Sequence, residues 1–213
     1  MEKQKQRLYV IGVTGPSGAG KSFFCDFFRA EGYKILDCDR IYAKMTSYYS
    51  GCMKELSDPR NFGPDILLPD GSLDRKKMAS AVFAEGAEDK LLLLNKITHK
   101  YVKRSIRRSL SYRPKNCRGF VIDAPLLFQA GLEKECDITV ALIAERALRV
   151  SRLKERDGIS SDAITARLSA AKPDSWYTER ADVTVINDGD ASALKKQADA
   201  IMEGRPDTAD GSL

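Results

Sequence analysis

The octapeptide GPSGAGKS, residues 15 to 22, constrains the fold of this chain more than any other stretch of the sequence. It matches the pattern G-x-x-x-x-G-K-[ST] and lies between the apolar run Leu8 to Val13 and a phenylalanine-rich stretch, the strand-loop-helix setting in which that pattern binds phosphates. The glycines let backbone amides turn towards a β-phosphate, the lysine brings a cation to the β- and γ-oxygens, and the serine hydroxyl is placed for Mg²⁺. The sequence therefore predicts a site for ATP or GTP; the alternative is a glycine turn that only joins strand and helix. The predicted nucleotide-binding residues are Gly15, Pro16, Ser17, Gly18, Ala19, Gly20, Lys21 and Ser22, and Ser22 is also the predicted metal ligand.

Five short apolar runs, rich in valine and isoleucine and with little polar alternation, predict strands that are buried on both faces. Between the first two runs, four phenylalanines are spaced for one face of a helix over Ser22 to Glu31. A strand, a glycine-rich turn, a helix and a second strand form a βαβ unit, so we predict an α/β fold with a parallel sheet flanked by helices. The runs are Leu8 to Val13, Lys34 to Leu36 with its flanks, Phe120 to Ile122, Ile138 to Ile143 and, as a fifth candidate, Val183 to Ile186; the phenylalanines are Phe23, Phe24, Phe27 and Phe28.

The stretch from Arg40 to Lys115 carries no strong strand and is too long for a crossover connection, so it predicts a helical insertion. Inside it, Leu73 to Glu85 and Asp89 to Leu110 have helical composition. The segment from Asn61 to Asp70 is interrupted by prolines and predicts a loop.

A second insertion, from Arg146 to about Glu179, is polar and basic and suits a lid, with breaks expected at Gly158 and Pro173. We expect a single domain over residues 1–213. Its core would cover about 7–45, 116–145 and 180–203, the first insertion about 46–115 and the lid about 146–179.

Carboxylates at the ends of two predicted strands are candidates for the acid that a phosphate-binding loop needs beside its metal and nucleophile. Asp123 ends the third apolar run, where a magnesium-binding acid would stand at the carboxyl edge of a core strand. Asp37 and Asp39 follow the second run in the same way. The alternative for each is helix capping, and Asp39 directly precedes a predicted helix at Arg40 to Met45.

Four arginines in the predicted lid, at spacings of three, three and four residues, form one stripe along a helix. A solvated stripe is the common explanation of such a pattern. In a phosphoryl-transfer enzyme, arginines on a lid also close over the γ-phosphate and take up transition-state charge. The stripe comprises Arg146, Arg149, Arg152 and Arg156.

The composition excludes some classes of protein but does not identify the binding partner. With 35 Lys+Arg against 30 Asp+Glu, the net charge of +5 suits any polyanion, nucleoside triphosphates included. The five cysteines are odd in number and contain no C-x-x-C pair, which argues against a disulfide framework or zinc ribbon and favours a reducing compartment. No apolar run approaches the ~18 residues of a membrane span or the core of a signal peptide, so we expect a cytoplasmic protein without a membrane partner.

Taken together, these features resemble the dephospho-CoA kinases, and the resemblance covers nearly the whole chain. Beyond the phosphate-binding loop, the matching pieces keep the family's order and spacing. They are Asp37-Cys38-Asp39, Asn61-Phe62-Gly63 with Ile66-Leu67, Asp70-Gly71-Ser72-Leu73-Asp74-Arg75, Val82-Phe83, the Ile97-Thr98-His99 region, Asp123-Ala124-Pro125-Leu126-Leu127-Phe128, Arg152-x-x-x-Arg156-Asp157, and Ala181-Asp182 leading to Asn187.

The resemblance implies that ATP, with Mg²⁺, donates its γ-phosphoryl group to the ribose 3′-hydroxyl of dephospho-CoA, giving CoA and ADP in the last step of coenzyme A biosynthesis. Asp39, Lys21 and Arg152 would be catalytic, with Asp39 accepting or orienting the hydroxyl proton. Arg152 and Arg156 would be lid residues on the donor phosphates, and Asn187 would lie where the family's C-terminal segment passes the adenine. The insertion would bind the acceptor, and the implied acceptor-binding residues are Asp39, Arg75, His99 and Asp123. The implied partners are these two small molecules, with no nucleic acid, and a monomer or weak homo-oligomer.

Three positions depart from the family's pattern. His99-Lys100 stands where the family usually has His-Pro, Gln129 where it has Glu, and Ala171 where it has Gln. We expect the first to change only a helix start or bend. The second removes a negative charge from near the acceptor side.

Three other functions are compatible with parts of the sequence. A different small-molecule kinase would share the phosphate-binding loop and differ only in its acceptor. A GTPase is disfavoured because Thr98 stands where the guanine-reading pattern Asn-Lys-x-Asp needs its acid. A nucleic-acid-binding module would use a basic run that contains few aromatic residues for base stacking. That run comprises Lys96, Lys100, Lys103, Arg104, Arg107, Arg108, Arg113, Lys115 and Arg118.

Overall fold

A computed structural model of the chain describes residues 7–112, 114–158, 160–169, 171–187 and 191–204. Its strands are β1 (Tyr9–Thr14), β2 (Tyr33–Asp37), β3 (Gly119–Asp123), β4 (Ile138–Ile143) and β5 (Val183–Ile186). Its α-helices are α1 (Lys21–Ala30), α2 (Cys38–Thr46), α3 (Gly51–Leu56), α4 (Arg75–Val82), α5 (Glu88–Leu110), α6 (Arg146–Asp157), α7 (Ser161–Ser169), α8 (Asp174–Thr178) and α9 (Ala191–Glu203). Two 3₁₀ turns, η1 (Pro64–Ile66) and η2 (Glu133–Glu135), complete the described elements.

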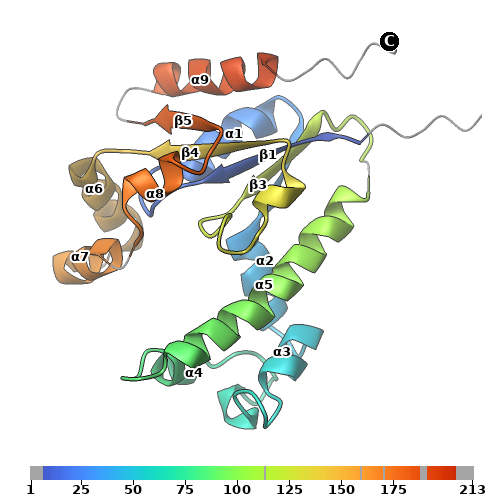
Figure 1. Ribbon diagram of the computed structural model, residues 1–213, viewed down its shortest axis with the longest axis vertical. Helices are drawn as coiled ribbons and strands as arrows, with labels where there is room; N and C mark the ends of the chain where they lie inside the picture. The colour runs from blue at the N-terminus through green and yellow to red at the C-terminus, as the bar shows by residue number, and fades with distance from the viewer. Residues whose placement is uncertain (1–6, 113, 159, 170, 188–190, 205–213) are drawn as a thin grey trace, which may run out of the picture. The chain divides into compact units, whose positions relative to one another are not determined.

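The five strands form one sheet in the order β2-β3-β1-β4-β5, with β1 at its centre (Figure 1). The pairs β1–β3, β1–β4 and β4–β5 are parallel, and in the first of these Val13 lies opposite Asp123. Every residue of β3 is buried, as its unbroken apolar run predicts for a strand covered on both sides. The α/β fold class and all five predicted strands are confirmed.

The α1 and α9 helices pack together against the sheet (Figure 1). Phe24 and Phe28 of α1 are fully buried among residues of β1, β3 and β4. Phe23, which we expected on the same apolar face, is 50% exposed. That part of the prediction is wrong because Phe23 lies about 100° around the helix from Phe24, on the side away from buried Cys25.

The chain divides into two compact units: a first unit of Met1–Leu36 with Tyr112–Leu213, and a second unit of Asp37–Ser111. The first unit holds the sheet, α1 and α6 to α9, and the second holds α2 to α5. Each unit has buried apolar clusters of its own. The division therefore assigns α2, and with it Asp39, to the second unit.

In the second unit, the helices predicted over Leu73 to Glu85 and Asp89 to Leu110 are observed as α4 and α5. The expected loop from Asn61 to Asp70 contains the short turn η1 and an isolated β-bridge from Leu67 to Leu73. The helix α3 was not singled out from the sequence. Its N-cap is Ser50, whose hydroxyl accepts a hydrogen bond from the backbone N–H of Met53.

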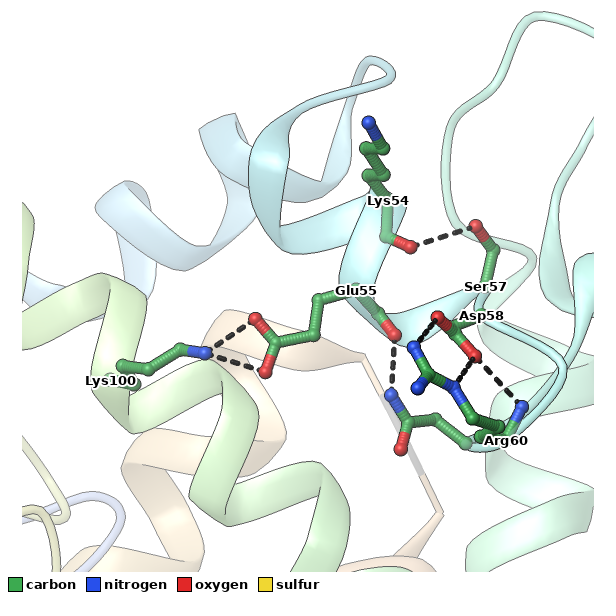
Figure 2. Close-up of polar contacts among 7 residues, drawn as sticks. Lys54, Glu55, Ser57, Asp58, Arg60 and Lys100 are labelled. Carbon is green, nitrogen blue, oxygen red and sulfur yellow. Dashed lines mark hydrogen bonds and ion pairs between the residues drawn. The ribbon is translucent and has the colours of Figure 1, made fainter.

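Lys100, one of the three departures from the family pattern, joins α5 to α3 (Figure 2). Its ammonium forms an ion pair with both carboxylate oxygens of Glu55, and the Tyr101 hydroxyl donates to the same carboxylate at 2.9 Å. The helix α5 continues through this position without interruption. The lysine that stands where the family has proline therefore forms an ion pair between two helices of this unit.

The Glu55–Lys100 pair makes the stability of the protein depend on pH. The Lys100 ammonium holds the pKa of the Glu55 carboxyl below its usual range, helped by Tyr101 and opposed by partial burial. Because the pKa is lower in the folded than in the unfolded chain, the contribution is present above the unfolded pKa and lost as pH falls through the folded one. We expect Lys100→Met to lower the free energy of unfolding by about 0.5 to 1 kcal/mol at neutral pH.

Urea unfolding at a series of pH values measures this effect, and the difference between wild type and variant should disappear in acid. Lys96→Met, an exposed lysine on the same helix, is the matched control and should change stability by less than about 0.5 kcal/mol. A Lys100→Met difference that persisted unchanged below the range in which Glu55 titrates would show that the ion pair is not its cause.

In the first unit, the segment after β4 forms α6, α7 and α8. Both expected breaks are confirmed, because Gly158 ends α6 with a φ of 61° and Pro173 is the N-cap of α8. Leu153 of α6 packs with Ile164 and Leu168 of α7 in a small buried cluster. The basic helix is thereby anchored on one side by apolar packing.

None of the five cysteines, all of which lie within the described ranges, takes part in a disulfide bond. Within the described ranges, no helix combines the length and apolarity that crossing a bilayer requires.

Candidate active site

The loop between β1 and α1 is shaped by three glycines with positive φ, at 141° for Gly15, 81° for Gly18 and 95° for Gly20. At Gly15 a side chain is also excluded by contact, because a Cβ there would lie 2.0 Å from the Leu142 carbonyl oxygen of β4. Left-handed backbone at these positions turns successive amides to one side, which makes a concave site for anions. The loop ends at the N-terminus of α1, whose dipole favours negative charge.

Lys21 is the first residue of α1 and lies across this loop. Its ammonium donates to the carbonyl oxygen of Gly15 at 2.9 Å and to that of Pro16 at 3.3 Å. These two hydrogen bonds hold the Lys21 ammonium against the loop that forms the anion site. A cation there is suited to phosphate oxygens.

Ser22 and Asp123, far apart in the sequence, meet at the carboxyl edge of the sheet. The Ser22 hydroxyl donates to Asp123 Oδ2 at 3.4 Å, and Asp123 is only 6% exposed. Serine and carboxylate oxygens are hard donors of the kind that Mg²⁺ takes, together with waters and substrate phosphates. These residues therefore fit a magnesium ion held by one or two protein oxygens. Within the described residues, no group of three or more His, Cys, Asp and Glu side chains forms a metal cage.

Arg152 of α6 also contacts the phosphate-binding loop. Its guanidinium donates to the carbonyls of Gly18 and Ala19 at 3.4 and 3.5 Å, and to the backbone and side-chain oxygens of Asn187 at 3.2 and 3.4 Å. The backbone of α6 is close enough that a Cβ on Gly18 would lie 2.8 Å from the Arg149 carbonyl oxygen. The structure therefore brings Arg152, predicted to be catalytic, to the phosphate-binding loop.

Asn187 is buried just after β5 and braces the loop. Its amide nitrogen Nδ2 donates to the Ala19 carbonyl at 2.7 Å, and its backbone N–H donates to Ile143 O at 2.9 Å. A Cβ on Gly20 would lie 2.3 Å from this amide nitrogen, which gives a second reason for glycine there. The predicted place of Asn187 beside an adenine stays a prediction.

Removing this brace should destabilise the first unit. We expect Asn187→Ala to lower the free energy of unfolding by about 1 to 3 kcal/mol, because the buried Ala19 carbonyl loses its shortest hydrogen bond. A drop in Tm of roughly 2 to 4 °C per kcal/mol follows for a chain of this size and is measured by calorimetry. Asn95→Ala removes the same amide from the half-exposed surface of α5 and is the control. Equal melting shifts for the two variants would contradict the bracing role.

Two other arginines of the stripe, Arg149 and Arg156, differ in their exposure and in their ion-pair partners. Arg156 is exposed and forms a two-point ion pair with Asp157, at 2.6 and 2.9 Å, so its predicted contact with donor phosphates stays a prediction. Arg149 is only 8% exposed and forms an ion pair with Asp174 of α8 at 3.2 Å. The common solvated explanation therefore does not hold for Arg149. The sequence does show that Arg149 lies on the same side of α6 as Arg152. It does not show that Arg149 is buried, because that depends on its contact with α8.

Asp39 lies in the first turn of α2, and its carboxylate is not the helix cap. Asp37 takes that place, with its Oδ1 accepting the backbone N–H of Arg40 at 2.9 Å. The capping alternative for Asp39 is therefore wrong. The helix begins at Cys38, two residues earlier than expected, because Asp37-Cys38-Asp39 offers two possible caps.

Two further predicted residues also lie in the second unit. Arg75 is the first residue of α4, beyond its N-cap Asp74, and its guanidinium lies 5.9 Å from the Tyr42 ring centroid of α2. His99 is half-buried on α5, and burial lowers the pKa of its imidazole, which favours the neutral ring. A neutral imidazole offers one donor and one acceptor to a substrate.

Known proteins are similar to this chain over most of its length. Residues 9–193 match a family model described as Dephospho-CoA kinase. A dephospho-CoA kinase of Corynebacterium glutamicum is 34% identical over 193 residues, covering 90% of this chain and 94% of that protein. The enzyme of Anaeromyxobacter dehalogenans is 35% identical over 197 residues, covering 92% and 91%.

Solved structures share the fold. The structure of TT1252 from Thermus thermophilus is 29% identical with a TM-score of 0.77, covering 94% of this chain and 100% of that one. A dephospho-CoA kinase from Campylobacter jejuni has a TM-score of 0.63 at 21% identity, covering 91% and 95%.

Proposed function

The chain belongs to the dephospho-CoA kinase family, and from this membership we propose which of its residues carry the phosphoryl transfer. The reaction moves the γ-phosphoryl group of ATP to the ribose 3′-hydroxyl of dephospho-CoA, giving CoA and ADP. Such a transfer needs little covalent chemistry from the protein, because it depends on positioning, exclusion of water and neutralisation of charge.

The donor side rests on one observation above the others: Lys21 and Arg152 approach the same glycine loop, each with hydrogen bonds to its carbonyls. We assign the phosphates of ATP to the amides of this loop, residues Gly15 to Ser22. The Lys21 ammonium then contacts the β- and γ-oxygens, and the Arg152 guanidinium neutralises charge that develops on the transferred group. Arg156 is a second lid contact, and Asn187 keeps the loop in the shape that receives the nucleotide.

Ser22 and Asp123 would hold Mg²⁺, through the hydroxyl directly and through the carboxylate directly or by way of a water. An ion held there would supply positive charge that stabilises the negative charge of the leaving group. Asp123 was also implied to contact the acceptor. Its burial and its place beside Ser22 support the metal assignment over that one.

On the acceptor side we assign Asp39 to the 3′-hydroxyl of dephospho-CoA. Its carboxylate accepts the hydroxyl proton as the oxygen attacks the γ-phosphorus, or holds that proton so that a lone pair faces the phosphorus. The finding that Asp37 caps α2 supports this role, because capping does not explain the presence of Asp39. Arg75 and His99 bind the remainder of the acceptor, Arg75 as a cation and His99 as a neutral hydrogen-bonding ring.

The test is an acceptor panel with Mg-ATP and dephospho-CoA, AMP, uridine or a sugar acid, following ADP release and product mass. The proposal expects the added mass of one phosphoryl group on dephospho-CoA alone. Phosphorylation of another acceptor would mean that the second unit recognises a different substrate. ADP release without any phosphorylated product would contradict the assigned acceptor site.

A further inference from the structure

The second unit contains a cavity of about 410 Å³ between α2, the start of α3 and α5. Its volume lies within the range of small-molecule sites. Three basic side chains line it, Lys44 from α2 and Arg104 and Arg108 from α5, together with the aromatic rings of Tyr48 and Tyr101. No aspartate or glutamate is among the lining residues. The cavity is therefore a concentration of positive charge with partly apolar walls.

The three cations have no counterion of their own. Across the residues that the structure describes, the side chains of Lys44, Arg104 and Arg108 take part in no hydrogen bond or ion pair. Lys100, on the same helix, shows the contrast, because its ammonium is paired with Glu55. Like charges gathered in one concave space repel one another, and an anionic ligand removes that repulsion.

One wall of the cavity is held in place. The Tyr101 hydroxyl donates to Glu55 at 2.9 Å, which fixes the ring, and a Cβ on Gly51 would be in van der Waals contact with it, 3.4 Å from ring atom Cε1. A ring fixed in this way offers a preformed apolar surface beside the charges of Arg104 and Arg108. The site is thus suited to a ligand that joins an anionic group to an uncharged part.

The cavity is distinct from the acceptor residues assigned above. At 100° per residue, Ile41, Lys44 and Met45 lie roughly 140° to 240° around α2 from Asp39. On α5, Arg104 and Arg108 lie roughly 140° and 180° from His99. Each helix therefore presents its acceptor residue on one face and the basic cavity on another.

We propose that this cavity is a second ligand site, which binds a small molecule carrying a diphosphate or triphosphate group. Three unpaired cations match the charge of such a group, and arginine forks bind phosphate oxygens in pairs. The proposal also explains part of the basic run on α5 that the kinase reaction leaves without a role. A long nucleic acid would follow an extended basic groove with several stacking rings, whereas the lining of this cavity offers three cations and two tyrosines.

Calorimetric titration with inorganic pyrophosphate tests the proposal, using Lys21→Ala protein so that the loop of the first unit contributes little. One pyrophosphate per chain is expected. Adding Arg104→Gln and Arg108→Gln should weaken binding by about tenfold or more, because two charged hydrogen-bond donors are lost. Adding Lys90→Gln and Lys96→Gln, exposed lysines of α5 outside the cavity, removes the same charge and should change affinity by less than about twofold.

Restoring the charge with Arg104→Lys and Arg108→Lys should recover most of the affinity, and equal melting temperatures exclude misfolding as the cause. A twenty-nucleotide RNA is titrated in parallel. Absence of pyrophosphate binding, equal losses in the two charge-matched variants, or binding of RNA but not pyrophosphate would each overturn the proposal. Because Lys21→Ala is the background throughout, these outcomes are independent of whether the kinase assignment holds.

Discussion

Asp39→Asn is expected to lower kcat by a factor of about 10² to 10⁴, the range for losing a group that accepts or orients a reacting proton. Asparagine has nearly the same size as aspartate, so the substitution removes the charge and the basic oxygen with little change in packing at this exposed position. The affinity for ATP should stay within a few fold of wild type, because the donor contacts come from residues of the first unit.

The matched control is Asp37→Asn, two residues earlier in the same motif. Asp37 accepts the Arg40 backbone N–H as the α2 cap, and asparagine caps a helix about as well as aspartate. The two variants therefore remove the same charge from neighbouring positions but differ in the expected chemistry. Stopped-flow or steady-state measurement of kcat separates them. Similar losses in both variants would assign the effect to local charge and remove Asp39 from the role of base.

The positions of the strands along the chain could be predicted from local sequence, because strands buried on both faces appear as unbroken apolar runs. Val121 and Ile122 of β3 and Val140 and Leu142 of β4 are fully buried, and their pattern needs no knowledge of the rest of the chain. The proximity of Ser22 and Asp123 could be anticipated for a related reason. Asp123 ends β3, the loop that leads to Ser22 leaves the carboxyl end of β1, and the two strands pair in parallel.

Features that depend on a choice between neighbouring residues or on distant partners could not be predicted. Either Asp37 or Asp39 could cap α2, and only the backbone geometry distinguishes them. Arg149 belongs to a stripe that has the composition of a solvated face, and its burial depends on Asp174 in a helix that follows much later in the chain. The Lys100 ion pair likewise needs Glu55 on α3, a six-residue helix too short to show a period of its own.

Lys21→Ala is expected to impair both ATP binding and turnover. Hydrogen bonds that involve a charged group contribute about 1.5 to 3 kcal/mol, so the dissociation constant for ATP should rise by roughly 10- to 150-fold. A further loss of about 10² to 10³ in kcat is expected because a preorganised cation at the transferred group acts most strongly in the transition state. Lys134→Ala removes the same charge from an exposed position of the first unit and is the control.

The balance between the two losses reveals how Lys21 acts, because its ammonium also hydrogen-bonds to the Gly15 and Pro16 carbonyls. If Lys21 only held the loop in shape, the variant would melt at a lower temperature, and kcat at saturating ATP would recover. If its charge acts on the phosphates, kcat stays low at saturation while the melting temperature without nucleotide changes little. An unaltered dissociation constant for ATP would contradict phosphate binding by this loop, and the donor half of the proposed mechanism would fail with it.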